Sequence, residues 1–190
     1  MRRAVWNQGW WAHADHCASP HHGPRPDGEA IDMVVIHSIS LPAGVYGGAY
    51  IHQLFLNRLD TSAHPEFERL RGLQVSAHFL IRRDGFIVQF VSCDHRAWHA
   101  GQSNWRGRNN CNDFSIGIEL EGLEGLSFEK PQYKALLRLI RSIRRHYPIA
   151  HIVGHEHIAP DRKQDPGAQF NWRHLRQELG EAGLSFPGMP

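Results

Sequence analysis

Two segments of this sequence concentrate the residue types that bind metal ions. His37 ends the apolar run 32–37, where a buried imidazole is costly unless it has a partner. Residues 154–167 follow a second short apolar run and hold further candidates: His155, His157, Asp161 and Asp165. A catalytic zinc ion takes three nitrogen or oxygen ligands from the protein and leaves a fourth position for water. The two segments could supply such a set, but their spacing alone does not choose among the candidates.

Hydrolysis by a metal-activated water also needs a base. Residues 114–121 alternate between apolar and polar side chains, which predicts a strand with one polar face. That face carries Ser115, Gly117, Glu119 and Glu121. Either carboxylate could act as the base, and Gly117 would leave space for a substrate or a metal-bound water.

Strand and helix patterns interleave along the chain. Strands are predicted at 32–37, 77–83, 86–91, 114–121 and 151–154, and helices at 49–58, 131–147 and 171–180. Asp84 and Gly85 predict a hairpin turn between two of these strands. We therefore predict a mixed α/β fold with one central, mostly mixed β-sheet flanked by helices.

Composition predicts one domain over residues 1–190, with an irregular N-terminal arm at 1–30 and a tail at 181–190. Of the 190 residues 41% are hydrophobic, and the formal charge of +2 favours neither nucleic acid nor a membrane as partner. No apolar run approaches the roughly 20 residues of a membrane span. The three cysteines show no Cys-x-x-Cys spacing and the N-terminus lacks the apolar stretch of a secretory signal, so we expect a reduced, cytoplasmic setting.

Five segments together carry a family resemblance. They are residues 35–42 (VIHSISLP), 75–85 (VSAHFLIRRDG), 96–101 (RAWHAG), 111–122 (CNDFSIGIELEG) and 154–167 (GHEHIAPDRKQDPG). In this order they resemble the AmpD-type 1,6-anhydro-N-acetylmuramyl-L-alanine amidases, which are related to phage amidase lysozymes and peptidoglycan recognition proteins. The resemblance runs from about Trp10 to Trp172. It implies hydrolysis of the amide between the lactyl group of (anhydro-)N-acetylmuramic acid and L-alanine, in cytoplasmic peptidoglycan recycling.

The resemblance also assigns residues to the chemistry. It makes His37, His155 and Asp165 the ligands of one zinc ion. Glu119 takes the position of the catalytic acid and base, and Lys163 that of the cation that stabilises the oxyanion. His157 and Glu121 are then left with structural roles.

Four residues are implied in substrate binding. Trp98 and His99 match residues that line the substrate cleft. Gln74 and Asn110 stand where the family often has arginines that meet the substrate, which puts strong binding of a peptide carboxylate in doubt. The implied partner is a small anhydromuropeptide rather than a nucleic acid or a membrane, and we expect a monomer.

Three other functions fit parts of the sequence. The chain could cleave the intact cell wall, or bind peptidoglycan without catalysis. A nucleophilic hydrolase could use Cys111 or Ser103, although residues 101–105 lack the second glycine of a nucleophile elbow. Separately, Gly47 and Gly48 could be either the hinge of a lid over residues 40–75 or an ordinary glycine-rich turn.

Overall fold

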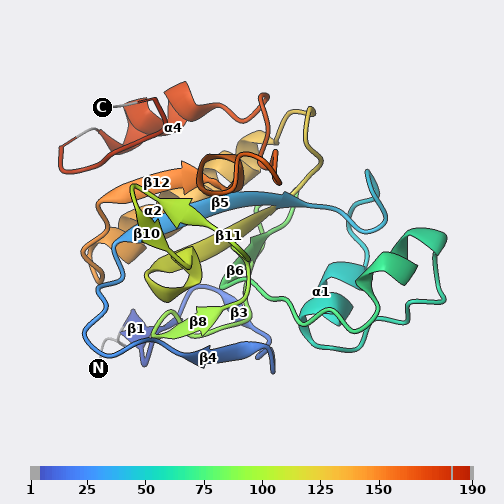
Figure 1. Cartoon of the computed structure of the whole chain (residues 1–190). Coiled ribbons are helices and arrows are strands. Elements are labelled where there is room, and N and C mark those ends of the chain that lie inside the picture. The colour runs from blue at the N-terminus through green and yellow to red at the C-terminus, as the bar shows by residue number, and fades with distance from the viewer. Residues whose placement is uncertain (1–4, 181, 189–190) are drawn as a thin grey trace.

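Six strands form one mixed β-sheet across the middle of the molecule (Figure 1). The computed structural model describes residues 5–180 and 182–188, so residues 1–4 of the predicted arm and residues 181, 189 and 190 of the predicted tail lie outside the described residues. In sheet order the strands are β12 (His151–Gly154), β5 (Met33–Ile39), β11 (Ser115–Glu121), β6 (Phe79–Ile81), β7 (Ile87–Gln89) and β3 (Asp15–His16). The first four are parallel, β7 is antiparallel to β6, and β3 is parallel to β7. The predicted fold class is confirmed.

The predicted turn joins β6 and β7. Gly85 has a φ of +86°, which other residues rarely adopt, and Asp84 Oδ1 accepts a hydrogen bond of 2.9 Å from the N–H of Phe86. A Cβ at position 85 would lie 2.8 Å from the carbonyl oxygen of Pro131. Gly85 therefore reverses the chain and also lets the start of helix α2 (Lys130–Arg144) approach the hairpin.

Strand β5 divides its side chains between the two faces of the sheet. Val34 and Ile36 pack in a large core cluster with the apolar side of α2. Met33 and Val35 belong to a separate cluster, as expected when successive side chains alternate between faces. His37 continues the series of Met33 and Val35, so its imidazole lies on the face turned away from α2.

The remaining elements are short. The helical ones are α1 (Tyr50–Phe55), η1 (Pro65–Leu70), η2 (Cys111–Asp113), α3 (His155–Ile158) and α4 (Trp172–Leu179). The strands are β1 (Trp6–Asn7), β2 (Trp10–Trp11), β4 (His22–Pro24), β8 (His95–Ala97), β9 (Asn104–Trp105) and β10 (Arg108–Asn109). α1 and α4 confirm two predicted helices, and α4 packs along α2 (Figure 1). Within the described ranges no helix has the length and apolar character to cross a membrane.

The described part of the N-terminal arm, which we predict to be irregular, contains short strands that bind it into the fold. β3 extends the main sheet, and β4 pairs antiparallel with β8. Immediately after β4, Arg25 donates hydrogen bonds of 2.8–3.1 Å to backbone carbonyl oxygens of four residues: Cys93, Asn112, Asp113 and Ser115. Burial lowers the pKa of Arg25 to about 10, so the guanidinium is still charged at neutral pH. One cation thus ties the arm to the start of β11.

We expect Arg25→Met to lower the free energy of unfolding by about 3–5 kcal/mol, because several buried carbonyl oxygens lose their donor and each such loss costs about 1–3 kcal/mol. Urea denaturation followed by circular dichroism measures the change. Arg58→Met is the matched control: Arg58 is exposed, and its replacement should change stability by less than about 0.5 kcal/mol. Equal losses in the two variants would show that the carbonyl contacts of Arg25 do not stabilise the fold.

Candidate active site

The register of the parallel strands brings the candidate residues to one edge of the sheet. β5 and β11 pair so that His37 lies opposite Glu119. β12 pairs with the other side of β5 and ends at Gly154, directly before His155. Ligand sites of α/β proteins commonly lie beyond the carboxyl ends of parallel strands, and this site follows that rule.

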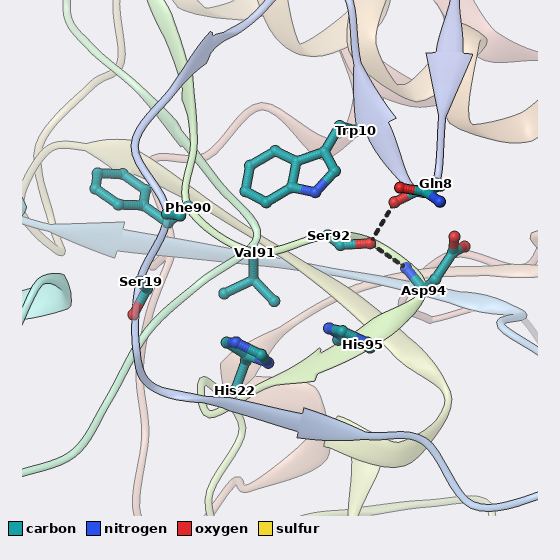
Figure 2. A pocket seen from close by; sticks show the side chains of 10 residues that line it. Gln8, Trp10, Ser19, His22, Phe90, Val91, Ser92, Asp94 and His95 are labelled. Carbon is teal, nitrogen blue, oxygen red and sulfur yellow. Dashed lines mark hydrogen bonds between the residues drawn. The ribbon is translucent and has the colours of Figure 1, made fainter.

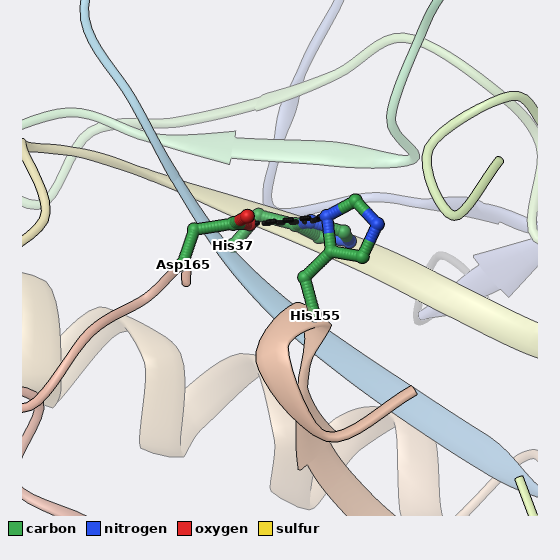
Figure 3. A group of neighbouring side chains, drawn as sticks. All are labelled: His37, His155 and Asp165. Carbon is green, nitrogen blue, oxygen red and sulfur yellow. Dashed lines mark hydrogen bonds and ion pairs between the residues drawn. The ribbon is translucent and has the colours of Figure 1, made fainter. Parts of the chain in front are cut away.

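Three side chains converge there on one point (Figure 3). His37 Nδ1 lies 3.0 Å from His155 Nδ1 and 3.0 Å from Asp165 Oδ2, and the last two atoms are 3.2 Å apart. Ligands at about 2.0–2.1 Å from a tetrahedral zinc ion are about 3.3 Å from one another. The three buried residues therefore have the chemistry and nearly the spacing of a three-ligand metal site.

The other candidates of the 154–167 segment lie outside this group. His157 Nδ1 accepts a hydrogen bond of 3.0 Å from the N–H of Gly154, and its ring packs edge-on against Trp172. Asp161 is exposed. Neither side chain shares the point on which the three buried residues converge.

The protonation states of the group suit a cation. Burial, followed by the neighbouring His155, lowers the pKa of His37 to about 4, so its imidazole is neutral at pH 7. Burial alone would raise the pKa of Asp165, but its side-chain contacts with His155 and His37 outweigh burial and lower that pKa. A metal ion binds neutral imidazole and ionised carboxylate, and both are present here.

Glu119 and Glu121 share one face of β11 but have opposite surroundings. Glu121 accepts hydrogen bonds at both oxygens, from the N–H groups of Gly47 at 2.7 Å and Arg83 at 3.2 Å. Glu119 Oε2 is buried without a hydrogen-bond partner. Burial, followed by the charge of Asp165, raises the pKa of Glu119 well above its usual value. Of the two carboxylates that the sequence left open, Glu119 is the one free to exchange a proton.

The three converging residues open into a cleft of about 430 Å³. Glu119, Lys163, Trp98 and His99 also line it. Among the described residues of the cleft wall, Arg69 and Lys163 carry the positive charge. Sequence reasoning did not single out Arg69, because nothing in its spacing sets it apart from other exposed arginines.

Gln74 and Asn110 do not line the cleft, although Leu73 and Val75 do. Gln74 is exposed between them, and exposed Asn110 precedes η2 with a φ of +55°. The space beside Gly117 is also not free for a substrate or a water, contrary to our expectation. A Cβ at position 117 would lie 2.4 Å from the ring of His99, so His99 fills that space.

The candidate nucleophiles are placed for structural roles. Ser103 Oγ donates to the carbonyl oxygen of Gly101 and accepts from the N–H of Cys111. The pKa of the Cys111 thiol is raised, mainly by burial. A buried thiol with a raised pKa is a poor nucleophile. The lid hypothesis stays a prediction, with the N–H of Gly47 held by Glu121 in this structure.

A second cavity, of about 380 Å³, lies under the N-terminal arm (Figure 2). Its polar groups largely bind one another: Ser92 Oγ donates to the carbonyl oxygen of Gln8 and accepts from the N–H of Asp94. Asp94 in turn accepts from the hydroxyl of Tyr147 at 2.7 Å. The rings of His22 and His95 stack with centroids 5.0 Å apart. These contacts indicate that the residues around this cavity pack the arm against β8.

Comparison with known proteins agrees with the geometry of the cleft. The sequence model of a family described as N-acetylmuramoyl-L-alanine amidase matches residues 27–168. The 1,6-anhydro-N-acetylmuramyl-L-alanine amidase AmpD of Escherichia coli (strain K12) is 50% identical over 171 residues, which cover 89% of this chain and 93% of AmpD. The crystal structure of a selenomethionine derivative of AmpD matches with a TM-score of 0.90 at 48% identity, covering 93% of this chain and all of that one (100%).

A solved complex adds a relative with a ligand. AmiD from E. coli, bound to the substrate anhydro-N-acetylmuramic acid-L-Ala-D-γ-Glu-L-Lys, matches with a TM-score of 0.58 at 32% identity, covering 81% of this chain and 60% of that one. The chain belongs to the N-acetylmuramoyl-L-alanine amidase family. It is thus an amidase, and within the family its similarity is to the AmpD type. The family and enzyme class predicted from the five segments are confirmed.

The buried residue His78 should make the stability of the fold depend on pH. It is fully buried, its Nδ1 accepts a hydrogen bond of 3.0 Å from the N–H of Gly117, and burial, followed by the charge of Arg25, lowers its pKa to about 3. The unfolded chain protonates this residue near pH 6.5, so between pH 6.5 and 3 the unfolded state binds more protons. Stability that is present above pH 6.5 is therefore lost as the pH falls.

We expect His78→Asn, whose amide oxygen can still accept from Gly117, to flatten this dependence. Between pH 6 and 5 the variant should lose about 1 kcal/mol per pH unit less than the unchanged chain, since one protonation linkage is removed. Urea denaturation at a series of pH values measures both slopes, and the difference cancels the contributions of all other groups. Parallel slopes would mean that His78 is not held neutral.

Proposed function

We propose that this chain is a zinc-dependent amidase of cytoplasmic peptidoglycan recycling. Its reaction is hydrolysis of the amide between the lactyl group of 1,6-anhydro-N-acetylmuramic acid and the L-alanine of the stem peptide. The observation that carries the proposal is the convergence of His37, His155 and Asp165 beside the unpartnered carboxylate of Glu119. The names of the AmpD relatives and the ligand in the AmiD complex support the substrate class.

His37, His155 and Asp165 would hold the zinc ion. Bound there, zinc would supply an activated water with a pKa of about 7 and polarise the scissile carbonyl. Glu119 removes a proton from the attacking water and returns one to the departing nitrogen of L-alanine. The raised pKa of Glu119 suits a group that must hold that proton between the two steps.

Lys163 stabilises the charge that develops on the lactyl oxygen. It lines the same cleft as the three ligands and acts electrostatically on both His37 and Glu119. As the carbonyl becomes tetrahedral, a cation at this place lowers the energy of the oxyanion. Gln74 and Asn110 do not line the cleft, so they do not contact the stem peptide. Arg69 is the second cation of the cleft wall and binds a carboxylate of the stem peptide. The indole of Trp98 forms another part of the wall.

An assay of the purified protein distinguishes the proposed activity from two related functions, cleavage of the intact cell wall and binding of peptidoglycan without catalysis. We expect release of the peptide from anhydromuramyl-tripeptide, loss of the activity when a chelator removes zinc, and recovery when zinc is returned. Chromatography measures the product, and mass spectrometry measures the metal. Faster cleavage of intact sacculi would replace the proposed substrate by the polymeric wall. Binding without turnover would indicate a peptidoglycan-binding module, and full activity in zinc-free protein would refute the zinc mechanism.

Substitutions of Glu119 and Lys163 separate catalysis from metal binding. Glu119→Gln should reduce kcat to near background, because the amide cannot accept the proton of the water. Lys163→Ala should reduce kcat by about 100–1,000-fold, the usual effect of losing one oxyanion donor. Both variants should retain one zinc ion per chain. The control is Lys134→Ala on the exposed side of α2, which should leave kcat unchanged. Arg162→Ala is unsuitable, because Arg162 donates a hydrogen bond of 2.8 Å to the carbonyl oxygen of Ala100. A wild-type kcat in either active-site variant removes that residue from the mechanism.

A further inference from the structure

The ring of His99 is buried against one face of β5 and β11, the two strands that carry His37 and Glu119. Its exposed fraction is 9%, and it fits over Gly117 so closely that a Cβ there would lie 2.4 Å from the ring. The backbone beside it is fixed as well, since Asn112 Oδ1 accepts hydrogen bonds from the N–H groups of both His99 and Ala100, at 3.1 and 2.9 Å. The structure therefore gives His99 one position.

Both ring nitrogens of His99 have partners inside the protein. Nδ1 lies 2.9 Å from Nε2 of His37, and Nε2 lies 3.1 Å from Oγ of Ser115. A ring with both nitrogens in use has none left to bind a substrate. Although His99 borders the cleft, its polar atoms point to a ligand residue and to β11, which differs from the substrate contact implied by the sequence resemblance.

The direction of the hydrogen bonds from His37 through His99 to Ser115 follows from the way His37 would bind a metal ion. Its Nδ1 is the atom that converges with His155 and Asp165, so Nδ1 must offer a lone pair and the proton must sit on Nε2. That N–H then donates to Nδ1 of His99. His99 in turn carries its own proton on Nε2 and donates it to the hydroxyl oxygen of Ser115.

The second histidine ligand is oriented by the neighbouring residue. His155 Nε2 lies 3.0 Å from the carbonyl oxygen of Ala100, which can only accept, so the proton of His155 is on Nε2 and its Nδ1 is free. Two neighbouring residues thus contact the two histidines: His99 binds His37 through its side chain, and Ala100 binds His155 through its carbonyl oxygen. His37 differs because its partner is an imidazole, which donates or accepts according to its tautomer. The hydroxyl of Ser115 can accept the proton that the metal-binding arrangement places on Nε2 of His99.

We propose that His99 and Ser115 form a relay that holds His37 in the tautomer that binds the metal ion. His99 is a positioning residue, and Ser115 accepts the last hydrogen bond of the relay. The relay rests on the zinc dependence proposed above. Groups that hydrogen-bond a metal-ligating histidine typically change metal affinity by about 10–100-fold when they are lost, so the relay acts on metal binding as well as on turnover.

The test compares zinc affinity, measured by competition with a chromophoric chelator, in four variants whose folding is checked by circular dichroism. His99→Leu removes both nitrogens and should weaken zinc binding by about 10–100-fold. His99→Asn places an amide oxygen near the former Nδ1, so it should recover most of the affinity. Ser115→Ala keeps the imidazole but removes its acceptor, and we expect about a 10-fold loss. His95→Leu, an exposed histidine outside the cleft, should bind zinc as the unchanged chain does.

Each result decides a separate question. Unchanged affinity in His99→Leu and Ser115→Ala would overturn the relay while leaving the zinc amidase intact. Equal losses in His99→Leu and His99→Asn would overturn it too, because packing of the ring would then be the whole effect. If the unchanged chain binds no zinc, the proposed function itself fails. Cobalt-substituted protein adds a check, since a shifted visible spectrum in Ser115→Ala shows an altered ligand field at an unchanged set of ligands.

Discussion

The in-register pairing of β5 with β11 is the constraint on which the rest of the site depends. It sets His37 beside Glu119 and, two residues earlier, Val35 beside Gly117. A slip by one residue would turn either side chain to the face covered by α2. The long apolar interface between α2 and the sheet makes such a slip costly. The hydrophobic core therefore fixes the relative position of His37 and Glu119.

Burial then determines the charge of each group at the carboxyl ends of the strands. A buried imidazole or carboxylate must find a hydrogen-bond partner or change its protonation state. His37 stays neutral, and the contacts of Asp165 with two imidazoles keep its carboxylate ionised. These are the states in which the residues can share a dication. The fold thus supplies the protonation states that metal binding needs, and the same buried contacts hold the side chains in place.

Local patterns in the sequence predicted much of this arrangement but not all of it. The apolar run before His37, the Asp84-Gly85 turn and the alternation of β11 depend on neighbouring residues, and the structure has all three. The arm is tied down by Arg25, whose acceptors lie about 70–90 residues away in the sequence. The filling of the space beside Gly117 by His99 is likewise a contact between distant segments. Periodicity carries no information on such pairs, so only the three-dimensional structure could show them.

Glu119 and Glu121 show how one strand can give two identical side chains different chemistry. Both point to the same face, two residues apart, and sequence pattern cannot separate them. Both oxygens of Glu121 accept hydrogen bonds from backbone N–H groups. Glu119 faces the cleft with a buried oxygen that no donor reaches, so its proton affinity rises. Because a general base must also release its proton, the carboxylate that the fold leaves unsatisfied is the one suited to catalysis, and its satisfied neighbour holds the backbone around it.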